Sequence, residues 1–144
     1  MPESIIVKQD RQFQIEFWVQ NLEKGGSEFQ RIDQITQLTP YGMMLASLAA
    51  CTTIVLHSYA QHRHLDLESV EMHMRYDRVY SQDCKVHKNE ENFSDAIHEE
   101  IIFRGKLSEA ERQKLMIIAR SCPVYKMYKK SIPIHSRLLS VLES

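Results

Sequence analysis

The hydrophobic pattern of this chain changes character at residues 43–56, which read MMLASLAACTTIVL. Apolar or small side chains occupy every side of a helical wheel there, and such a helix has to be buried on all sides. Thr39 and Pro40 precede the segment as an N-cap and a first helical residue that needs no N–H donor. The pattern predicts a central helix of roughly 24 residues, with a polar end at residues 61–64 that reaches solvent.

Before and after this helix in the sequence, apolar and polar residues alternate, which is typical of strands with one solvent-exposed face. The strands predicted in this way span residues 4–8, 13–20, 27–32, 65–76, 97–104 and 132–134. The mostly polar residues 77–94 are expected to form a long hairpin loop. Because Pro133 cannot donate to a ladder, the last strand should lie at a sheet edge.

Two further helices are expected between the last two strands. Ser108 and Glu111 form a capping box, and one apolar stripe follows it. Pro123 ends that helix and can begin a short one over residues 125–130. The whole order indicates a single α+β domain (residues 1–144), built from antiparallel runs of strands around the central helix.

Composition narrows the classes of function. The 144 residues are 43% hydrophobic and 26% charged, with a net charge of −1, so no basic field exists to hold nucleic acid or an anionic membrane. The apolar run of the central helix is shorter than the ~20 residues of a membrane span, and the N-terminus lacks the pattern of a signal peptide. We therefore expect a soluble, cytoplasmic protein whose three cysteines are reduced, catalytic or metal-binding.

Cys51 and Cys122 are the candidate reactive groups, one on each of the two longer predicted helices. Both are expected on buried faces, where packing as small apolar side chains is the simpler interpretation. Cys51 lies about three turns into its helix, too deep for the helix dipole to assist ionisation. Cys122 precedes Pro123 at the start of the short helix, so the local sequence favours Cys122 as the more acidic thiol.

Two motifs resemble those of the OsmC/Ohr family. Residues 39–52, TPYGMMLASLAACT, are similar to its central-helix signature, in which a Pro at the helix start is followed by small residues and Ala-Ala-Cys. Cys122-Pro123-Val124 resembles the second signature, Cys-Pro on a later helix. The resemblance covers nearly the whole chain and implies an intertwined homodimer, with antiparallel sheets wrapped around two long central helices.

The activity implied by the resemblance is the reduction of organic hydroperoxides at the subunit interface, without a cofactor. Cys51 would attack a small apolar peroxide and become a sulfenic acid, Cys122 would close a disulfide, and a dithiol reductant would reopen it. The residues expected to line the pocket beside Cys51 are Tyr41, Met44, Ser47 and Leu48.

Tyr41 departs from the family pattern. The Ohr-type peroxidases that this chain resembles carry a Glu directly after the helix-start Pro. That Glu pairs with an Arg from a loop between early strands, and the Arg holds the reactive thiol as a thiolate. Arg11, in the turn expected between the first two strands, is the candidate for this Arg. The alternative hypothesis is a relative that is not a peroxidase and binds a small apolar ligand in the same pocket.

The seven histidines raise the question of a metal site. His57, His62 and His64 cluster at the end of the central helix, and Cys84 and His87 have the spacing of a ligand pair. Neither set has a second spaced pair to complete three or four converging ligands. No metal site is predicted.

Overall fold

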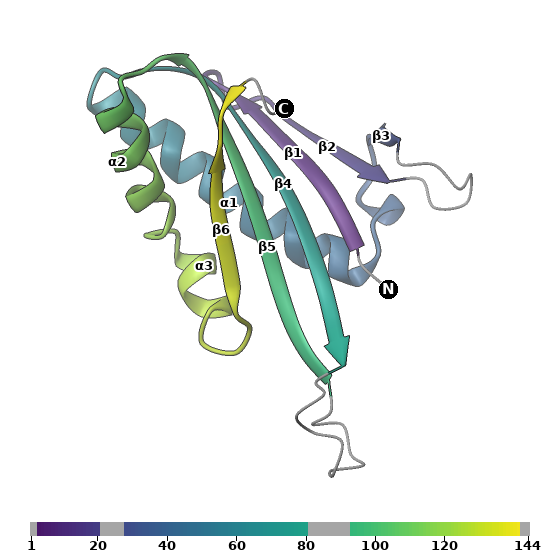
Figure 1. The fold of residues 1–144 in the computed structure, drawn as a ribbon. Coiled ribbons are helices and arrows are strands. Elements are labelled where there is room, and N and C mark those ends of the chain that lie inside the picture. The colour runs from purple at the N-terminus through teal and green to yellow at the C-terminus, as the bar shows by residue number, and fades with distance from the viewer. Residues whose placement is uncertain (1–2, 21–27, 81–92, 142–144) are drawn as a thin grey trace.

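One mixed sheet carries the fold, and α1 crosses one of its faces (Figure 1). The computed structural model describes residues 3–20, 28–80 and 93–141, and the side chains of 78–80, 93 and 94 are not among its described features. The strands are β1 (Glu3–Asp10), β2 (Ile15–Gln20), β3 (Phe29–Ile32), β4 (Asp66–Tyr80), β5 (Phe93–Lys106) and β6 (Ile134–Leu139). The helices are the 3-10 helix η2 (Ile35–Gln37), α1 (Pro40–His62), α2 (Glu109–Ala119) and α3 (Pro123–Tyr128).

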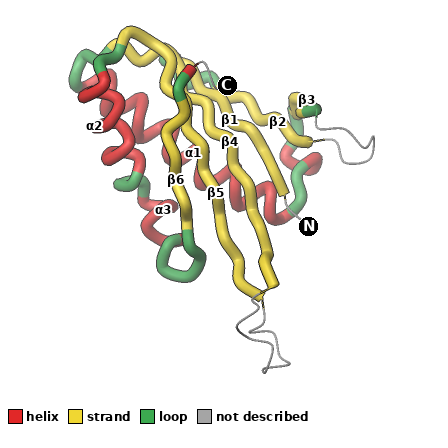
Figure 2. The backbone as a smooth tube through the Cα atoms, viewed as in Figure 1, coloured by secondary structure: helices red, strands yellow, loops and turns green. Residues whose placement is uncertain are grey.

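The sheet has six strands in the order β3-β2-β1-β4-β5-β6. All neighbouring pairs are antiparallel except β5 and β6, which run parallel. A parallel pair needs a crossover connection, and α2 and α3 provide it; Figure 2 shows both helices on the chain between these strands. The α+β class is confirmed, and so is the edge position of the last strand, but the expectation of purely antiparallel pairing is wrong at this edge.

Alternation along the strands builds the core as predicted. One face of the central strands is fully buried, and its side chains are those of Ile5, Val7, Val70, Met72, Met74, Ile97, Ile101 and Phe103. α1 contacts β1 and β4 and is flanked by α2 and α3. The central helix is thus packed between the sheet and the two later helices of its own chain.

The caps of both long helices are confirmed. Thr39 accepts a hydrogen bond from the Gly42 N–H at 3.1 Å, with Pro40 as the first helical residue. Ser108 and Glu111 form the expected capping box. These side chains satisfy N–H groups that the helix itself leaves without partners, so the start of each helix is encoded locally.

α1 is buried on only part of its circumference in a single chain. The sides that meet the sheet and the later helices contain buried residues such as Leu45, Leu48 and Leu56. The remaining side, which we call the open side of α1 and which borders α3 at Ser47, carries Met43, Ser47, Cys51, Ile54 and Ser58, each exposed or partly exposed. Within one chain, this side of α1 therefore leaves small and apolar residues uncovered.

α1 is also long and apolar enough to cross a membrane by length and composition, contrary to the expectation from its shorter apolar run. Half of its most apolar window is buried inside the fold. A helix packed against a sheet in this way has the position of a core helix.

Three expectations about strand ends are wrong. The last strand is Ile134–Leu139 and not 132–134, so Pro133 precedes it, and the other two expectations concern Phe13 and the loop at 77–94. Phe13 does not start β2 but lies in the preceding turn with φ 64°, where Asp10 Oδ1 accepts hydrogen bonds from the N–H groups of Gln12 and Gln14. The turn places the Phe13 ring edge-on to His57 of α1, with centroids 6.0 Å apart. The expected loop at 77–94 is shorter than predicted, because β4 and β5 remain paired as far as Tyr80 and Phe93.

Candidate functional site: a pair of thiols between α1 and α3

The structure brings Cys51 and Cys122 together. Cys51 lies on the open side of α1, and Cys122 lies at the junction of α2 and α3. Their side chains lie close enough for the Cys51 thiol to act on the ionisation of Cys122, and both are free cysteines. Cys51 is partly exposed, whereas Cys122 has no exposed surface. The pair therefore has one thiol that solvent or a small molecule can reach and one that solvent cannot reach.

Local sequence explains how Cys122 reaches this position. α2 ends at Ala119, and Pro123 starts α3 at its first helical position with Cys122 as the N-cap residue. α3 is tied to α1 by a hydrogen bond of 2.9 Å between the hydroxyls of Tyr128 and Ser47. The break at Pro123 turns the chain so that Cys122 points at α1 and not along the stripe of α2.

Electrostatics separates the two thiols further. Burial raises the pKa of Cys122 above its usual value, and the neighbouring Cys51 thiol raises this pKa further. The backbone N–H of Tyr125 and the hydroxyl of Thr52 act on the same pKa in the opposite direction and only partly offset the burial. The expectation that Cys122 gains enough from the start of its helix to be an acidic thiol is therefore wrong, because desolvation of a buried thiolate outweighs the helix end.

Arg11 lies away from the thiol pair of its own chain. Its guanidinium is paired with Asp66 at 3.0 Å, and its carbonyl oxygen accepts a hydrogen bond from Gln61 Nε2 at 2.9 Å. Gln61 is at the far end of α1, roughly 15 Å along the helix from Cys51. Within one chain Arg11 is thus held at the end of α1, and an activating role for it stays a prediction that requires a second copy.

The four predicted pocket residues occupy different environments. The ring of Tyr41 packs against that of Tyr76, with centroids 4.8 Å apart. Met44 is half-buried, and Ser47 is exposed beside Tyr128. Leu48 is fully buried, because its position on the helix faces the core and not the open side, so it does not line an opening of this chain. Met44 and Ser47 thus keep some exposed surface on the turns that precede Cys51, whereas Tyr41 lies ten residues, roughly 15 Å along the helix, from Cys51. A pocket shared by these residues stays a prediction.

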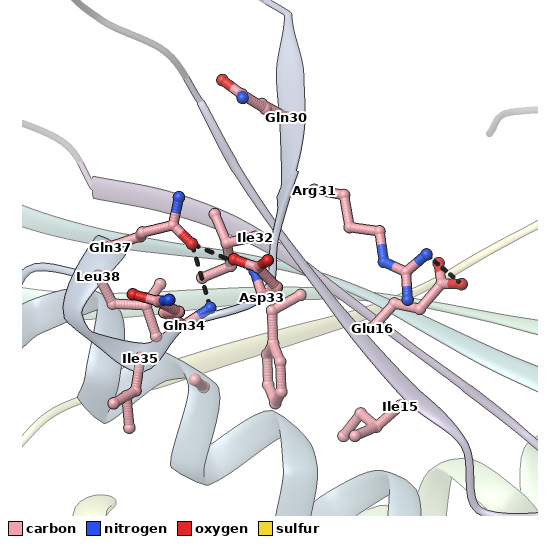
Figure 3. A pocket seen from close by; sticks show the side chains of 12 residues that line it. Ile15, Glu16, Gln30, Arg31, Ile32, Asp33, Gln34, Ile35, Gln37 and Leu38 are labelled. Atoms are coloured by element: carbon pink, nitrogen blue, oxygen red, sulfur yellow. Dashed lines mark hydrogen bonds and ion pairs between the residues drawn. The ribbon is translucent and has the colours of Figure 1, made fainter.

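A cavity of about 770 Å³ lies elsewhere, between β2, β3, η2 and the start of α1 (Figure 3). Apolar side chains such as Ile15, Ile32 and Leu38 line it together with polar ones, among them the ion pair of Arg31 and Glu16 at 3.8 Å. α1 contributes Ala46, which lies on a different side of the helix from Cys51. This cavity contains neither thiol.

His57, one of the three histidines considered as metal ligands at the end of α1, contacts the protein backbone. His57 is buried, and its Nε2 lies 2.9 Å from the Gln9 carbonyl oxygen. Among residues 3–20, 28–80 and 93–141, no group of three or more His, Cys, Asp or Glu side chains is arranged to hold a metal ion. Cys84 and His87 lie outside the described residues.

Thr52 is the neighbour of the thiol pair that sequence reasoning missed. It is buried, and its hydroxyl acts on Cys122. The available signal was a pair of hydroxyl residues, Thr52 and Thr53, directly after Cys51 in an otherwise apolar helix. Such residues need a hydrogen-bond partner inside a core, which could have marked them for attention.

Several solved structures share this fold. The organic hydroperoxide resistance protein OhrB of Bacillus subtilis is 14% identical with a TM-score of 0.55, and the match covers 95% of this chain and 97% of that one. An organic hydroperoxide resistance protein OsmC from Legionella pneumophila is 15% identical with a TM-score of 0.57, covering 92% and 95%. An OsmC-like protein from Mycoplasma pneumoniae is 14% identical with a TM-score of 0.53, covering 94% and 95%.

At these identities the structural matches speak for the fold alone. No curated protein matches the chain. The family model described as OsmC-like protein matches residues 33–137, a span that includes all of α1, both candidate thiols and most of β6. The resemblance noted in the two Cys motifs is thereby confirmed, and the chain belongs to the family of OsmC-like proteins.

Proposed function

We propose that this protein is a homodimeric thiol peroxidase that reduces small apolar organic hydroperoxides through Cys51 and Cys122. The observation that carries the proposal is the closeness of a partly exposed and a fully buried free thiol. A peroxidase of this kind needs an attacking thiol that substrate can reach and a second thiol within bonding reach of it. The proposal also agrees with the names of the Bacillus and Legionella proteins, which are organic hydroperoxide resistance proteins.

The reaction assigns each thiol a step. The Cys51 thiolate attacks the terminal oxygen of the hydroperoxide, the O–O bond breaks, and the alcohol leaves after taking a proton. Cys51 is then a sulfenic acid, and the Cys122 sulfur attacks it to form a disulfide while the oxygen leaves as water. A dithiol reductant restores both thiols and is itself oxidised to a disulfide.

The open side of α1 supports a dimer with the active site at its interface. Met43 and Ile54 are more than a third exposed on the same side as Cys51, at 37% and 46%. A second copy packed there would bury apolar surface and enclose the thiol in a pocket suited to an apolar peroxide. The same second copy could supply the arginine that Cys51 lacks in its own chain.

The test is a stoichiometric oxidation. Reduced protein receives one equivalent of an alkyl hydroperoxide, and its cysteines are then mapped by mass spectrometry. We expect consumption of the peroxide and a Cys51–Cys122 disulfide, a trapped sulfenic acid on Cys51 in Cys122→Ser, and no consumption in Cys51→Ser. Persistence of the peroxide together with unmodified Cys51 in the wild-type protein would refute the proposal.

Binding of a small apolar ligand without peroxide chemistry is the second candidate function. Two observations favour it. Tyr41 packs against Tyr76, at the position where the Ohr-type peroxidases that this chain resembles carry a Glu. Arg11 is paired with Asp66 and not with a residue near Cys51. Under this alternative, an apolar fluorescent probe binds equally well to wild-type protein and to a Cys51→Ser variant, and peroxide is not consumed.

A further inference from the structure

Two adjacent threonines follow Cys51, and their hydroxyls have different environments. Thr53 Oγ1 donates to the carbonyl oxygen of Ala50 at 3.0 Å, the usual arrangement for a hydroxyl inside a helix. Thr52 Oγ1 is equally buried but makes no hydrogen bond of regular geometry within the described part of the chain. An unsatisfied buried hydroxyl is destabilising, so its presence needs an explanation.

The Cys122 thiol is the group close enough for the Thr52 hydroxyl to act on it, although the two make no hydrogen bond of regular geometry. The hydroxyl acts on this thiol in the direction that favours its charged form. A neutral thiol is a weak acceptor, whereas a thiolate accepts hydrogen bonds strongly. The Thr52 hydroxyl, which has no good acceptor while Cys122 is neutral, therefore gains one when Cys122 carries a negative charge.

We propose that the Thr52 hydroxyl is a catalytic hydrogen-bond donor that stabilises the Cys122 thiolate released when the Cys51–Cys122 disulfide is reduced. This inference rests on the proposed function, since it assigns a role within the same redox cycle. It deepens that function by naming the group that makes a buried sulfur an adequate leaving group.

Exposure decides which sulfur leaves. A reductant can reach Cys51, which is partly exposed, but not Cys122, which is fully buried. A thiolate of the dithiol attacks the Cys51 sulfur, a mixed disulfide forms, and the electron pair of the broken S–S bond goes to Cys122. The second thiol of the reductant then attacks the mixed disulfide and releases Cys51, leaving a reductant disulfide. The Cys122 thiolate takes a proton from solvent, or from the second thiol as that thiol ionises to attack.

Burial alone makes Cys122 a poor leaving group, because disulfide exchange slows as the leaving thiol becomes less acidic. A hydrogen bond to a charged acceptor offsets this effect. The same donor acts in the forward direction, where the Cys122 thiolate attacks the Cys51 sulfenic acid. Thr52 thus favours the ionised state that both half-reactions pass through.

The experiment follows reduction of a preformed disulfide. The Cys51–Cys122 bond is made with diamide, without any peroxide, in a Cys84→Ser background, and its reduction by dithiothreitol is timed. We expect Thr52→Val, which keeps shape and removes the hydroxyl, to slow reduction about threefold to tenfold, since roughly half of a leaving-group effect appears in the rate. Thr52→Ser, which keeps the hydroxyl, should reduce at close to the wild-type rate.

Thr53→Val is the matched control, because it makes the same change one residue away at a hydroxyl bound to Ala50. It should not slow reduction. A second readout is the ultraviolet absorbance of the Cys122 thiolate in a Cys51→Ala background, which should appear at higher pH in Thr52→Val and not in Thr53→Val. If melting shows that valine is not accommodated, Thr52→Ala replaces it in both measurements.

The outcomes separate this inference from the proposed function. Equal rates in Thr52→Val and wild type, or equal slowing in Thr52→Val and Thr52→Ser, would overturn the role of the hydroxyl. If peroxide fails to oxidise Cys51 but Thr52→Val still slows reduction of the diamide-formed disulfide, the peroxidase proposal falls and the donor role stands.

Discussion

Ile54 offers the sharpest test of the proposed dimer. It lies in the middle of the open side of α1, one residue after Thr53, and 46% of its surface is exposed in a single chain. If the chain were a monomer, Ile54→Glu would place a carboxylate in water on a helix surface, and such changes usually alter stability by ~0.5 kcal/mol or less. In a dimer the same carboxylate would lie inside the interface, once from each copy.

The magnitude follows from the exposed fraction. Full burial of an isoleucine contributes about 1.5–3 kcal/mol, so the half that remains exposed would contribute about 1 kcal/mol per copy at an interface. Two copies lose about 2 kcal/mol, and two desolvated carboxylates without partners add at least as much again. A total near 4 kcal/mol corresponds to about a thousandfold weaker dimer.

Sedimentation equilibrium over a range of protein concentrations measures this effect. Ile117→Glu is the control, because Ile117 is 60% exposed on α2 and lies outside the open side of α1. We expect Ile117→Glu to sediment like the wild-type dimer and Ile54→Glu to dissociate. A wild-type protein that sediments as a monomer, or an Ile54→Glu variant that dimerises as tightly as wild type, would refute the proposed interface.

Three further predictions concern stability and activity. Burial raises the pKa of the Glu99 carboxyl, which the Ser136 hydroxyl partly opposes by donating to it at 2.6 Å. The stabilising effect of Glu99 is therefore complete below the unfolded-state pKa near 4.5 and is lost as the pH rises through the folded-state pKa. Glu99→Gln should flatten the decline in unfolding free energy above pH 4.5, measured by urea titration. An unchanged slope would contradict this. Gly105 has φ +139° and a Cβ there would lie 2.0 Å from the Asp66 carbonyl oxygen, so Gly105→Ala should destabilise the fold by ~3 kcal/mol or more, and an unaltered melting temperature would show that the backbone yields freely. Tyr41→Glu supplies the carboxylate of Ohr-type relatives and should speed peroxide consumption in a stopped assay; an unchanged rate would mean that another group orients the activating arginine.

Much of this architecture follows from short-range signals. The caps at Thr39 and Ser108 depend on atoms within three residues, so the starts of α1 and α2 could be predicted from sequence. Strand alternation likewise identifies the buried face without knowledge of the neighbours. The two Cys motifs were sufficient to indicate the family, which the match over residues 33–137 confirms.

Other features depend on which elements meet in space. Phe13 continues the alternation of β2 in sequence, yet the hydrogen bonds of Asp10 place it in a turn, and this turn lies against His57 of α1. The direction of β6 depends on the crossover through α2 and α3 and not on any residue of the strand itself. Arg11 was assigned by its place in a turn, and only the tertiary structure shows that Asp66 holds it.

The thiol pair shows most clearly which properties follow from the sequence and which depend on the tertiary structure. In the sequence, the resemblance to the OsmC/Ohr family implies that Cys51 and Cys122 act together, and Cys122 lies at a helix start, which by itself would make that thiol more acidic. Its acidity is decided by complete burial between α1, α2 and α3, because desolvation of a charge depends on everything packed around it. The environment of the Thr52 hydroxyl likewise depends on the tertiary structure, since only the packing of the helices determines which group lies beside it.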